Sequence, residues 1–194
     1  MARPRTYVRE EVVRKATDLF IRKGYEGAHL QELVRVTGLN RFSLYKEFGG
    51  KEGLFQAALD AYMERLGSLA RILQREPLGV ANVRHFFHEL LCQDFPHGCL
   101  AVNTIREKHV VPKHVYATIE RFAAMAEDLY RKNLTAAKAR GELGADADAE
   151  IDIEALTRFL TALDIGLMSY GVVSPGRTDA RQITSVLDRL LKPR

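Results

Sequence analysis

The sequence predicts an all-helical fold. Apolar residues recur at helical spacing along most of the 194 residues, and no stretch shows the sustained alternation of a half-buried strand. Glycines stand just after several of these periodic stretches, at positions where helices commonly end in the left-handed conformation. The chain is 46% hydrophobic and 28% charged, which is typical of an ordinary folded protein. About nine helices are expected.

The first fifty residues predict one longer helix and two short ones around a tight turn. The first is marked by five apolar residues at helical spacing, and Gly24 stands where a left-handed cap would end it. These five are Val12, Val13, Ala16, Leu19 and Phe20. A second short helix is broken by Thr37-Gly38-Leu39, and a third runs from Asn40, a good N-cap, to Phe48. The turn has the length and the glycine of a helix-turn-helix.

A long fourth helix is expected from Lys51 onward, after Gly49-Gly50 ends the third. Further helices are expected at about 79–93, in a short stretch after Gly98, and at 113–140, 151–172 and 177–192. We therefore expect residues 1–50 to form a helix-turn-helix domain, and residues 51–194 to form a second helical domain that follows it without a linker.

The positive charge is concentrated at the N-terminus. Residues 1–51 hold 11 Lys and Arg against 6 Asp and Glu, whereas residues 52–194 hold 18 against 19. A basic end on a neutral remainder is expected of a protein whose N-terminal part meets phosphates. A lipid surface would give the same asymmetry, but these basic residues are spread over short helical units instead of lining one amphipathic helix.

Several classes of protein are disfavoured by what the chain lacks. No apolar run reaches the roughly 18 to 20 residues that cross a bilayer, and residues 1–5 lead into charged sequence instead of a signal peptide. A cytoplasmic protein is therefore expected, and in that compartment Cys92 and Cys99 should be reduced thiols. There is no glycine-rich phosphate loop and no nucleophile elbow, so we expect neither an enzyme nor a cofactor.

The third helix carries side chains suited to DNA. Arg41 can bond guanine or a phosphate, Phe42 can pack on a thymine methyl, and Ser43 can serve in either role. Tyr45 and Lys46, with Lys51 at the start of the next helix, form a cluster suited to phosphate oxygens. A packed core aromatic is the alternative for the tyrosine, and ordinary solvated charge is the alternative for the lysines.

Residue types at fixed spacing across these four helices resemble the N-terminal domain of the TetR family of repressors. They are Leu19-Phe20, Gly24-Tyr25, Leu39-Asn40-Arg41, Leu44-Tyr45, Phe48, Lys51-Glu52 and Leu54-Phe55. The resemblance covers about residues 9–60. It implies a three-helix DNA-binding head on a connecting fourth helix, a ligand-binding and dimerisation body at 51–194, and a homodimer on a palindromic operator of double-stranded DNA.

Three positions depart from the family pattern. Ala28 and His29 stand where the family usually opens the second helix with Thr or Ser, and His29 is expected to take over the phosphate contact unless it is merely exposed. Phe42 occupies a position that is often small and Glu47 one that is often basic, so the operator sequence does not transfer. The expected DNA-binding residues are His29, Asn40, Arg41, Phe42, Ser43, Tyr45, Lys46 and Lys51.

The segment from Gly98 to Asn103 reads Gly-Cys-Leu-x-x-Asn and resembles a turn in a subgroup of TetR-like regulators, some of which sense electrophiles, oxidants or aldehydes through that cysteine. Amides at a helix N-terminus lower a thiol pKa, whereas a packing cysteine is the alternative for Cys99. A noncovalent pocket for a small molecule of unknown class is the more general expectation. The ligand or sensor candidates are Phe86, Phe87, Cys99, Asn103, His109, Tyr116, Met125 and Met168.

His85, His88 and Cys92 fall on one face of an expected helix, where they could bind a borderline metal with His97, Cys99 or His109. No CxxC or HExxH pattern supports a metal site, so none is assigned. The favoured interpretation is a repressor released from DNA by a small molecule or thiol-reactive compound. A metal-responsive regulator, a ligand-independent regulator and a helical interaction adaptor are the alternatives.

The last two expected helices carry apolar or small residues on more than one face, which predicts that both their own body and a partner cover them. In TetR-like proteins the corresponding helices form the dimer interface. The expected interface residues are Leu156, Ala162, Gly166, Ser169, Ile183, Leu187 and Leu190.

Overall fold

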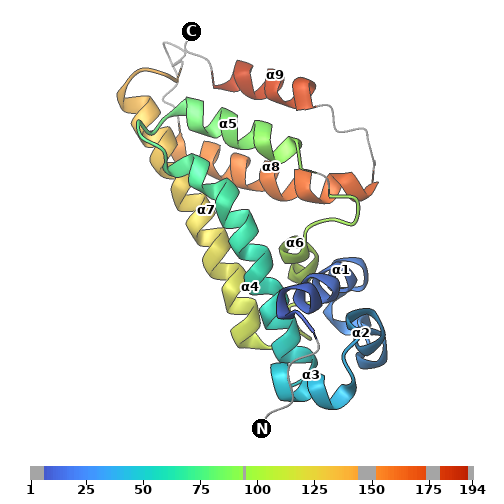
Figure 1. The fold of residues 1–194 in the computed structure, drawn as a ribbon. Coiled ribbons are helices and arrows are strands. Elements are labelled where there is room, and N and C mark those ends of the chain that lie inside the picture. The colour runs from blue at the N-terminus through green and yellow to red at the C-terminus, as the bar shows by residue number, and fades with distance from the viewer. Residues whose placement is uncertain (1–6, 94, 144–151, 174–179, 192–194) are drawn as a thin grey trace. The chain divides into compact units, whose positions relative to one another are not determined.

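The computed structural model describes residues 7–93, 95–143, 152–173 and 180–191. Within these ranges the chain is all-helical, as predicted, with nine α-helices and one short 3-10 helix (Figure 1). The N-terminal helices are α1 (Arg9–Gly27), α2 (Leu30–Thr37), α3 (Arg41–Phe48) and α4 (Lys51–Ala70). They are followed by η1 (Arg71–Gln74), α5 (Val80–Leu91), α6 (Leu100–Ile105), α7 (Lys113–Ala139), α8 (Ile153–Val173) and α9 (Ala180–Leu190).

Each expected helix is present, with ends that differ from the sequence-based ones by a few residues. The short helix η1 was not expected. Residues 151, 177–179 and 192, which the sequence placed at the ends of the last two helices, lie outside the described ranges.

The chain folds as two compact units, each formed by two separate stretches of sequence. Unit 1 comprises Met1–Arg65 and His97–Ile119, and unit 2 comprises Leu66–Pro96 and Glu120–Arg194. Helices α4 and α7 therefore contribute residues to both units.

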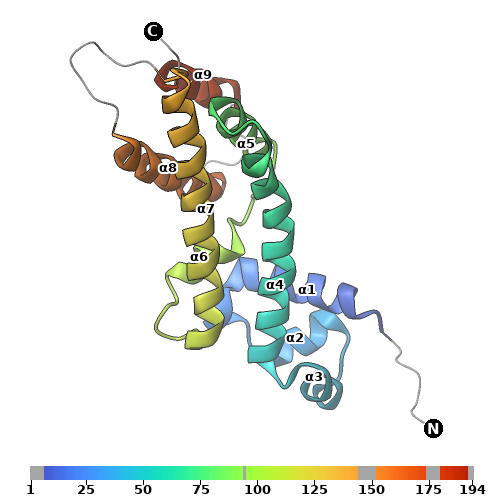
Figure 2. The same cartoon turned by 90° about the vertical axis from the view of Figure 1, so that its left-hand side faces the viewer.

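The core of unit 1 joins the first four helices. Leu19 and Phe20 of α1 are buried, and the rings of Phe20 and of Phe55 on α4 meet edge to face with centroids 4.8 Å apart. Leu33 of α2 and Leu44 of α3 complete this core. Burial of each such side chain contributes roughly 1.5–3 kcal/mol. Helix α6 lies against α1 in the same unit (Figures 1 and 2).

The core of unit 2 is built around Tyr130 and Asn133 of α7. Asn133 donates to the carbonyls of Leu73 and Leu129 at 2.7 and 2.9 Å, and its amide oxygen accepts hydrogen bonds from the Gly79 amide and the Asn82 side chain. Every polar atom of this buried side chain is therefore satisfied. Helix α9 runs beside α5 in both views (Figures 1 and 2).

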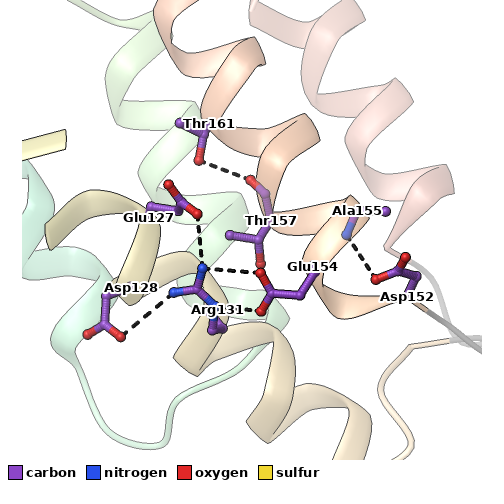
Figure 3. Close-up of polar contacts among 8 residues, drawn as sticks. All are labelled: Glu127, Asp128, Arg131, Asp152, Glu154, Ala155, Thr157 and Thr161. Carbon is purple, nitrogen blue, oxygen red and sulfur yellow. Dashed lines mark hydrogen bonds and ion pairs between the residues drawn. The ribbon is translucent and has the colours of Figure 1, made fainter. Parts of the chain in front are cut away.

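The start of α8 is held to α7 by an ion-pair network on the surface of unit 2. Asp152 caps the helix by accepting from the Ala155 amide at 3.0 Å, and Arg131 bonds Glu154 at 2.6 Å and Glu127 at 2.9 Å (Figure 3). The partners are substantially exposed, so the network contributes little to stability and mainly sets the position of α8 on α7.

Candidate nucleic-acid interface

The turn between α2 and α3 is built by local interactions that the sequence encodes. Gly38 ends α2 in the left-handed conformation at φ 75°, and its amide bonds the Val34 carbonyl. Asn40 then caps α3, because its side-chain oxygen accepts from the Ser43 amide at 2.8 Å. The expected cap and glycine turn are thus confirmed, and they fix where α3 begins.

Helix α3 has one buried and one exposed face. Leu44 is fully buried and Phe48 is nearly so, whereas Phe42 is 76% exposed and Tyr45 is 49% exposed. The short helix is thereby anchored from beneath while it presents two aromatic rings to its surroundings.

The exposed face combines these rings with positive charge. The Arg41 guanidinium lies 5.8 Å from the centre of the Tyr45 ring, within range of a cation–π contact. The other side of Tyr45 approaches Gly50, where an added Cβ would come within 3.2 Å of the ring. Gly50 also has φ 121°, a conformation that other residues rarely adopt. Tyr45 is therefore a supported, half-exposed ring, and the alternative of a core aromatic does not hold.

Lys51 has a role within the protein that the sequence did not reveal. Its ammonium donates to the Glu26 carbonyl at 3.2 Å and lies 4.7 Å from the centre of the Tyr25 ring. Partial burial lowers the pKa of Lys51. This lysine ties the beginning of α4 to the end of α1.

Of the remaining expected DNA-binding residues, His29 and Lys46 are exposed and Ser43 is half-buried. His29 is the N-cap residue of α2, but its side chain forms no capping bond, and the buried Ala28 before it supplies none. Lys46 lies in the last turn of α3 and is exposed. All eight expected residues belong to unit 1, at the start of α2, in the turn, along α3 and at the start of α4.

Glu47 on α3 is held by residues at the beginning of the chain. The Tyr7 hydroxyl donates to one carboxylate oxygen at 3.0 Å, and the Arg9 guanidinium lies 3.5 Å from the other. Arg9 also stacks over the Phe48 ring. The acid that departs from the family pattern is thus offset by a neighbouring cation, and it links the first turn of α1 to α3.

Glu107, just after α6, holds the end of α1. Its carboxylate accepts from the Tyr25 amide at 2.7 Å and the Glu26 amide at 3.0 Å. Gly24 adopts φ 73°, and a Cβ there would lie 2.6 Å from a Glu107 oxygen. Gly24 has a positive φ, but its ψ of 178° is not that of the expected left-handed cap, and the helix resumes beyond it as far as Gly27. We call Glu107 with Gly24, Tyr25 and Glu26 the Glu107 clasp.

Half of the expected ligand or sensor residues lie in unit 1. Cys99 is fully buried at the N-terminus of α6, and burial together with this thiol raises the pKa of Tyr62. Asn103 donates to the carbonyls of Ile21 and His97 at 3.1 and 3.0 Å, so it supports the contact between α6 and α1. His109 is exposed, and Tyr116 lies beneath the ammonium of Lys108.

The other half lie in unit 2. Phe86 and Phe87 are buried and pack on each other and on Tyr130. Met168 is nearly buried, whereas Met125 is 38% exposed. The structure therefore divides the eight candidates between its two units.

The histidines and Cys92 on α5 contact one another only loosely. The Cys92 sulfur lies 4.0 Å from the His88 ring, and both histidines of α5 lie within 3.7 Å of the Glu89 carboxylate. Over the described ranges, no group of three or more side chains is arranged to hold a metal ion. None of the helices in those ranges is long and apolar enough to cross a membrane.

The expected dimer residues differ in exposure. Ala162, Gly166 and Leu190 are exposed, Leu156, Ser169 and Ile183 are half-buried, and Leu187 is buried within the subunit. Further large apolar side chains are exposed on α8 and α9, namely Phe159, Ile165, Tyr170, Val172 and Val186. These two helices therefore carry a broad apolar surface.

Comparison with known proteins places this architecture among DNA-binding regulators. Residues 12–58 match the family described as bacterial regulatory proteins, tetR family. The chain is 30% identical over 171 residues to the HTH-type transcriptional repressor ComR of Escherichia coli K12, covering 85% of this chain and 80% of ComR. It is 29% identical over 197 residues to the uncharacterized HTH-type transcriptional regulator YezE of Bacillus subtilis 168, and the match covers 98% of this chain and 94% of YezE.

Solved structures agree with these matches. A cysteine mutant of the TetR family regulator CifR, in complex with 26-base-pair double-strand operator DNA, superposes with a TM-score of 0.76 at 27% identity, and the match covers 98% of each chain.

Proposed function

The chain belongs to the TetR family and is a DNA-binding transcriptional regulator, and from this premise we propose that it is a homodimeric repressor that a small molecule releases from a palindromic operator. The observation that carries the proposal is the capped helix α3, which is anchored by buried Leu44 while Arg41 and Phe42 are exposed. A helix of this kind is what enters a major groove. The repressor name of ComR and the operator complex of CifR support the proposal.

The first turn of α3 contacts the base edges. Arg41 bonds guanine, Phe42 contacts a thymine methyl, and Ser43 supplements them. The capping side chain of Asn40 lies beside this turn. His29, Tyr45, Lys46 and Lys51 contact phosphates, which supply most of the affinity and fix the register.

A homodimer follows from the geometry of DNA. Two recognition helices must lie about 34–36 Å apart to enter successive major grooves on one face of the duplex. The exposed apolar side chains of α8 and α9, among them Phe159, Tyr170 and Leu190, support these helices as the shared interface. Leu187 is buried within its own subunit, so it does not belong to the exposed part of this interface.

Release of the repressor from DNA requires that ligand binding in the C-terminal body changes the DNA-binding head. We assign residues 1–50 to DNA binding, and residues 51–194 to ligand binding and dimerisation. Only two residues separate the end of α3 from helix α4, which continues without a break from Lys51 to Ala70, so no long linker separates these two parts of the chain. A noncovalent ligand is favoured over a thiol switch, because Cys99 is fully buried. Reaction of Cys99 with an electrophile is the second route.

Selection of genomic fragments with the purified protein tests this function. Enrichment of a palindrome by the wild-type protein, and its loss with Arg41→Ala, is the expected result. Repetition after treatment with an aldehyde or quinone, in wild type and Cys99→Ser, separates the two routes of release. A selection that enriches no sequence would overturn the proposed function.

A further inference from the structure

The inward face of α8 carries two polar residues in an otherwise apolar stripe. This buried stripe consists of Thr157, Leu160, Asp164 and Met168. Thr157 is 0% exposed and Asp164 is 7% exposed, although Asp is one of the residue types least often buried without a charged partner. The exposed apolar residues of α8 lie on other faces, so Asp164 belongs to the interior of unit 2.

Two buried oxygen atoms on this stripe lack a hydrogen-bond partner among the described residues. One carboxylate oxygen of Asp164 accepts from the Tyr130 hydroxyl at 3.1 Å, but the other has no partner. The Thr157 hydroxyl also has none. Buried polar atoms of folded proteins are almost always paired, so each exception calls for an explanation such as an absent ligand.

Asp164 reaches an aromatic cluster through its hydrogen bond with Tyr130. Tyr130 packs on Phe86 and Phe87, with ring centres 5.6 and 5.9 Å away, and the two phenylalanines meet edge to face at 5.4 Å. None of the described lysine or arginine side chains forms an ion pair with Asp164. Burial raises the pKa of Asp164 to about 7, so the carboxyl is balanced between its neutral and charged forms near neutral pH.

A carboxylate beside aromatic rings has the chemistry that recognises organic cations. We propose that Asp164, with Phe86, Phe87 and Tyr130, forms the binding site for an apolar amine, and that such an amine is the releasing ligand. The ammonium pairs with the free oxygen of Asp164, while its apolar part packs on the rings. This inference rests on the proposed function, because it names the class of ligand for that same response.

Calorimetric titration of the full chain with phenethylamine, and with phenylethanol as its neutral counterpart, tests the site without DNA. The wild-type protein should bind the amine at least roughly tenfold more tightly than the alcohol. Asp164→Asn should abolish this preference. Glu89→Gln removes the same charge from an exposed position on α5, outside the contact between α7 and α8, so it should leave the preference unchanged.

Tyr130→Phe separates a binding role from a structural one. Tyr130→Phe removes the hydrogen bond between these two side chains, whereas Asp164→Asn keeps an amide oxygen that can still accept it. If the carboxylate serves only that bond, Tyr130→Phe loses the preference at least as fully as Asp164→Asn. If it binds the amine, Tyr130→Phe retains the preference for the amine while Asp164→Asn loses it. Absence of amine binding by the wild-type protein, or an equal loss in both variants, would overturn the proposal.

Operator binding, measured separately by fluorescence anisotropy, distinguishes this inference from the proposed function. Sequence-specific operator binding without amine binding would reject the site alone. Loss of operator binding on addition of phenethylamine, in wild type but not in Asp164→Asn, would support both. Amine binding that leaves operator affinity unchanged would establish the site but reject its role in release.

Discussion

Removal of the Glu107 carboxylate should loosen the end of α1. Glu107→Ala deletes two hydrogen bonds from backbone amides, at 2.7 and 3.0 Å. A hydrogen bond to a charged group contributes about 1.5–3 kcal/mol when buried, and one of these two is exposed, so we expect a loss of about 2 kcal/mol in the free energy of unfolding of unit 1. Glu107→Gln keeps one acceptor oxygen and should lose about half as much.

A substitution at Gly24 tests the same contact with the Glu107 carboxylate from the other side. Gly24→Ala strains a residue at φ 73° by about 1–2 kcal/mol, and its new methyl group collides with the Glu107 carboxylate. Because the collision disappears once Glu107 is alanine, the double variant should be more stable than the sum of the two single effects predicts, by about 1 kcal/mol.

Urea unfolding measures these free energies, and hydrogen exchange locates the change. The amides of Tyr25 and Glu26 should lose protection in Glu107→Ala, whereas those of α5 should not. Strict additivity of the two substitutions, or unchanged protection of the two amides, would refute the clasp as a stabilising contact.

Three further predictions concern single side chains. Phe42→Ala should lower operator affinity about tenfold, measured by anisotropy. Because the ring is 76% exposed, the free energy of unfolding, measured in urea, should change by less than about 0.5 kcal/mol. A large loss of stability would contradict the exposed placement of this ring. Asn40→Ala should cost about 1 kcal/mol of stability by removing the cap of α3, whereas Asn40→Ser should restore most of it in the same unfolding assay. In the wild-type protein, the Asp164 pKa of about 7 lies above its ordinary value of 3.8, so the native state holds this proton more tightly and the free energy of unfolding should fall as pH rises between these values. Asp164→Asn lacks this decline, so it should be more stable than wild type at pH of about 8 and differ little at pH of about 4, and parallel pH profiles of the two proteins would contradict it.

Local signals explain why much of the fold followed from the sequence. The Gly38 amide bonds the Val34 carbonyl four residues back, and the Asn40 side chain bonds the Ser43 amide three residues on, so residues close in sequence determine the end of α2 and the start of α3. The apolar spacing around Leu19 likewise identifies the buried face of α1.

Contacts between distant residues explain what sequence reasoning missed. Glu107 bonds an amide 82 positions away and Tyr7 bonds Glu47 across 40 positions, and no local pattern marks either pair. The intramolecular contacts of Lys51 were hidden for the same reason. Asp164 did leave a signal, because a single charged residue within an apolar helical stripe marks a buried polar site.

Whether α3 reads DNA sequence can be measured by an anisotropy titration of the selected operator against a scrambled palindrome. Affinity for both duplexes should fall with salt, and the wild-type protein should prefer the operator by at least about 10³-fold. Arg41→Ala should remove much of this preference, while Lys46→Ala should weaken binding to both duplexes about equally. Equal binding of the operator and the scrambled duplex by the wild-type protein would show that α3 does not read sequence.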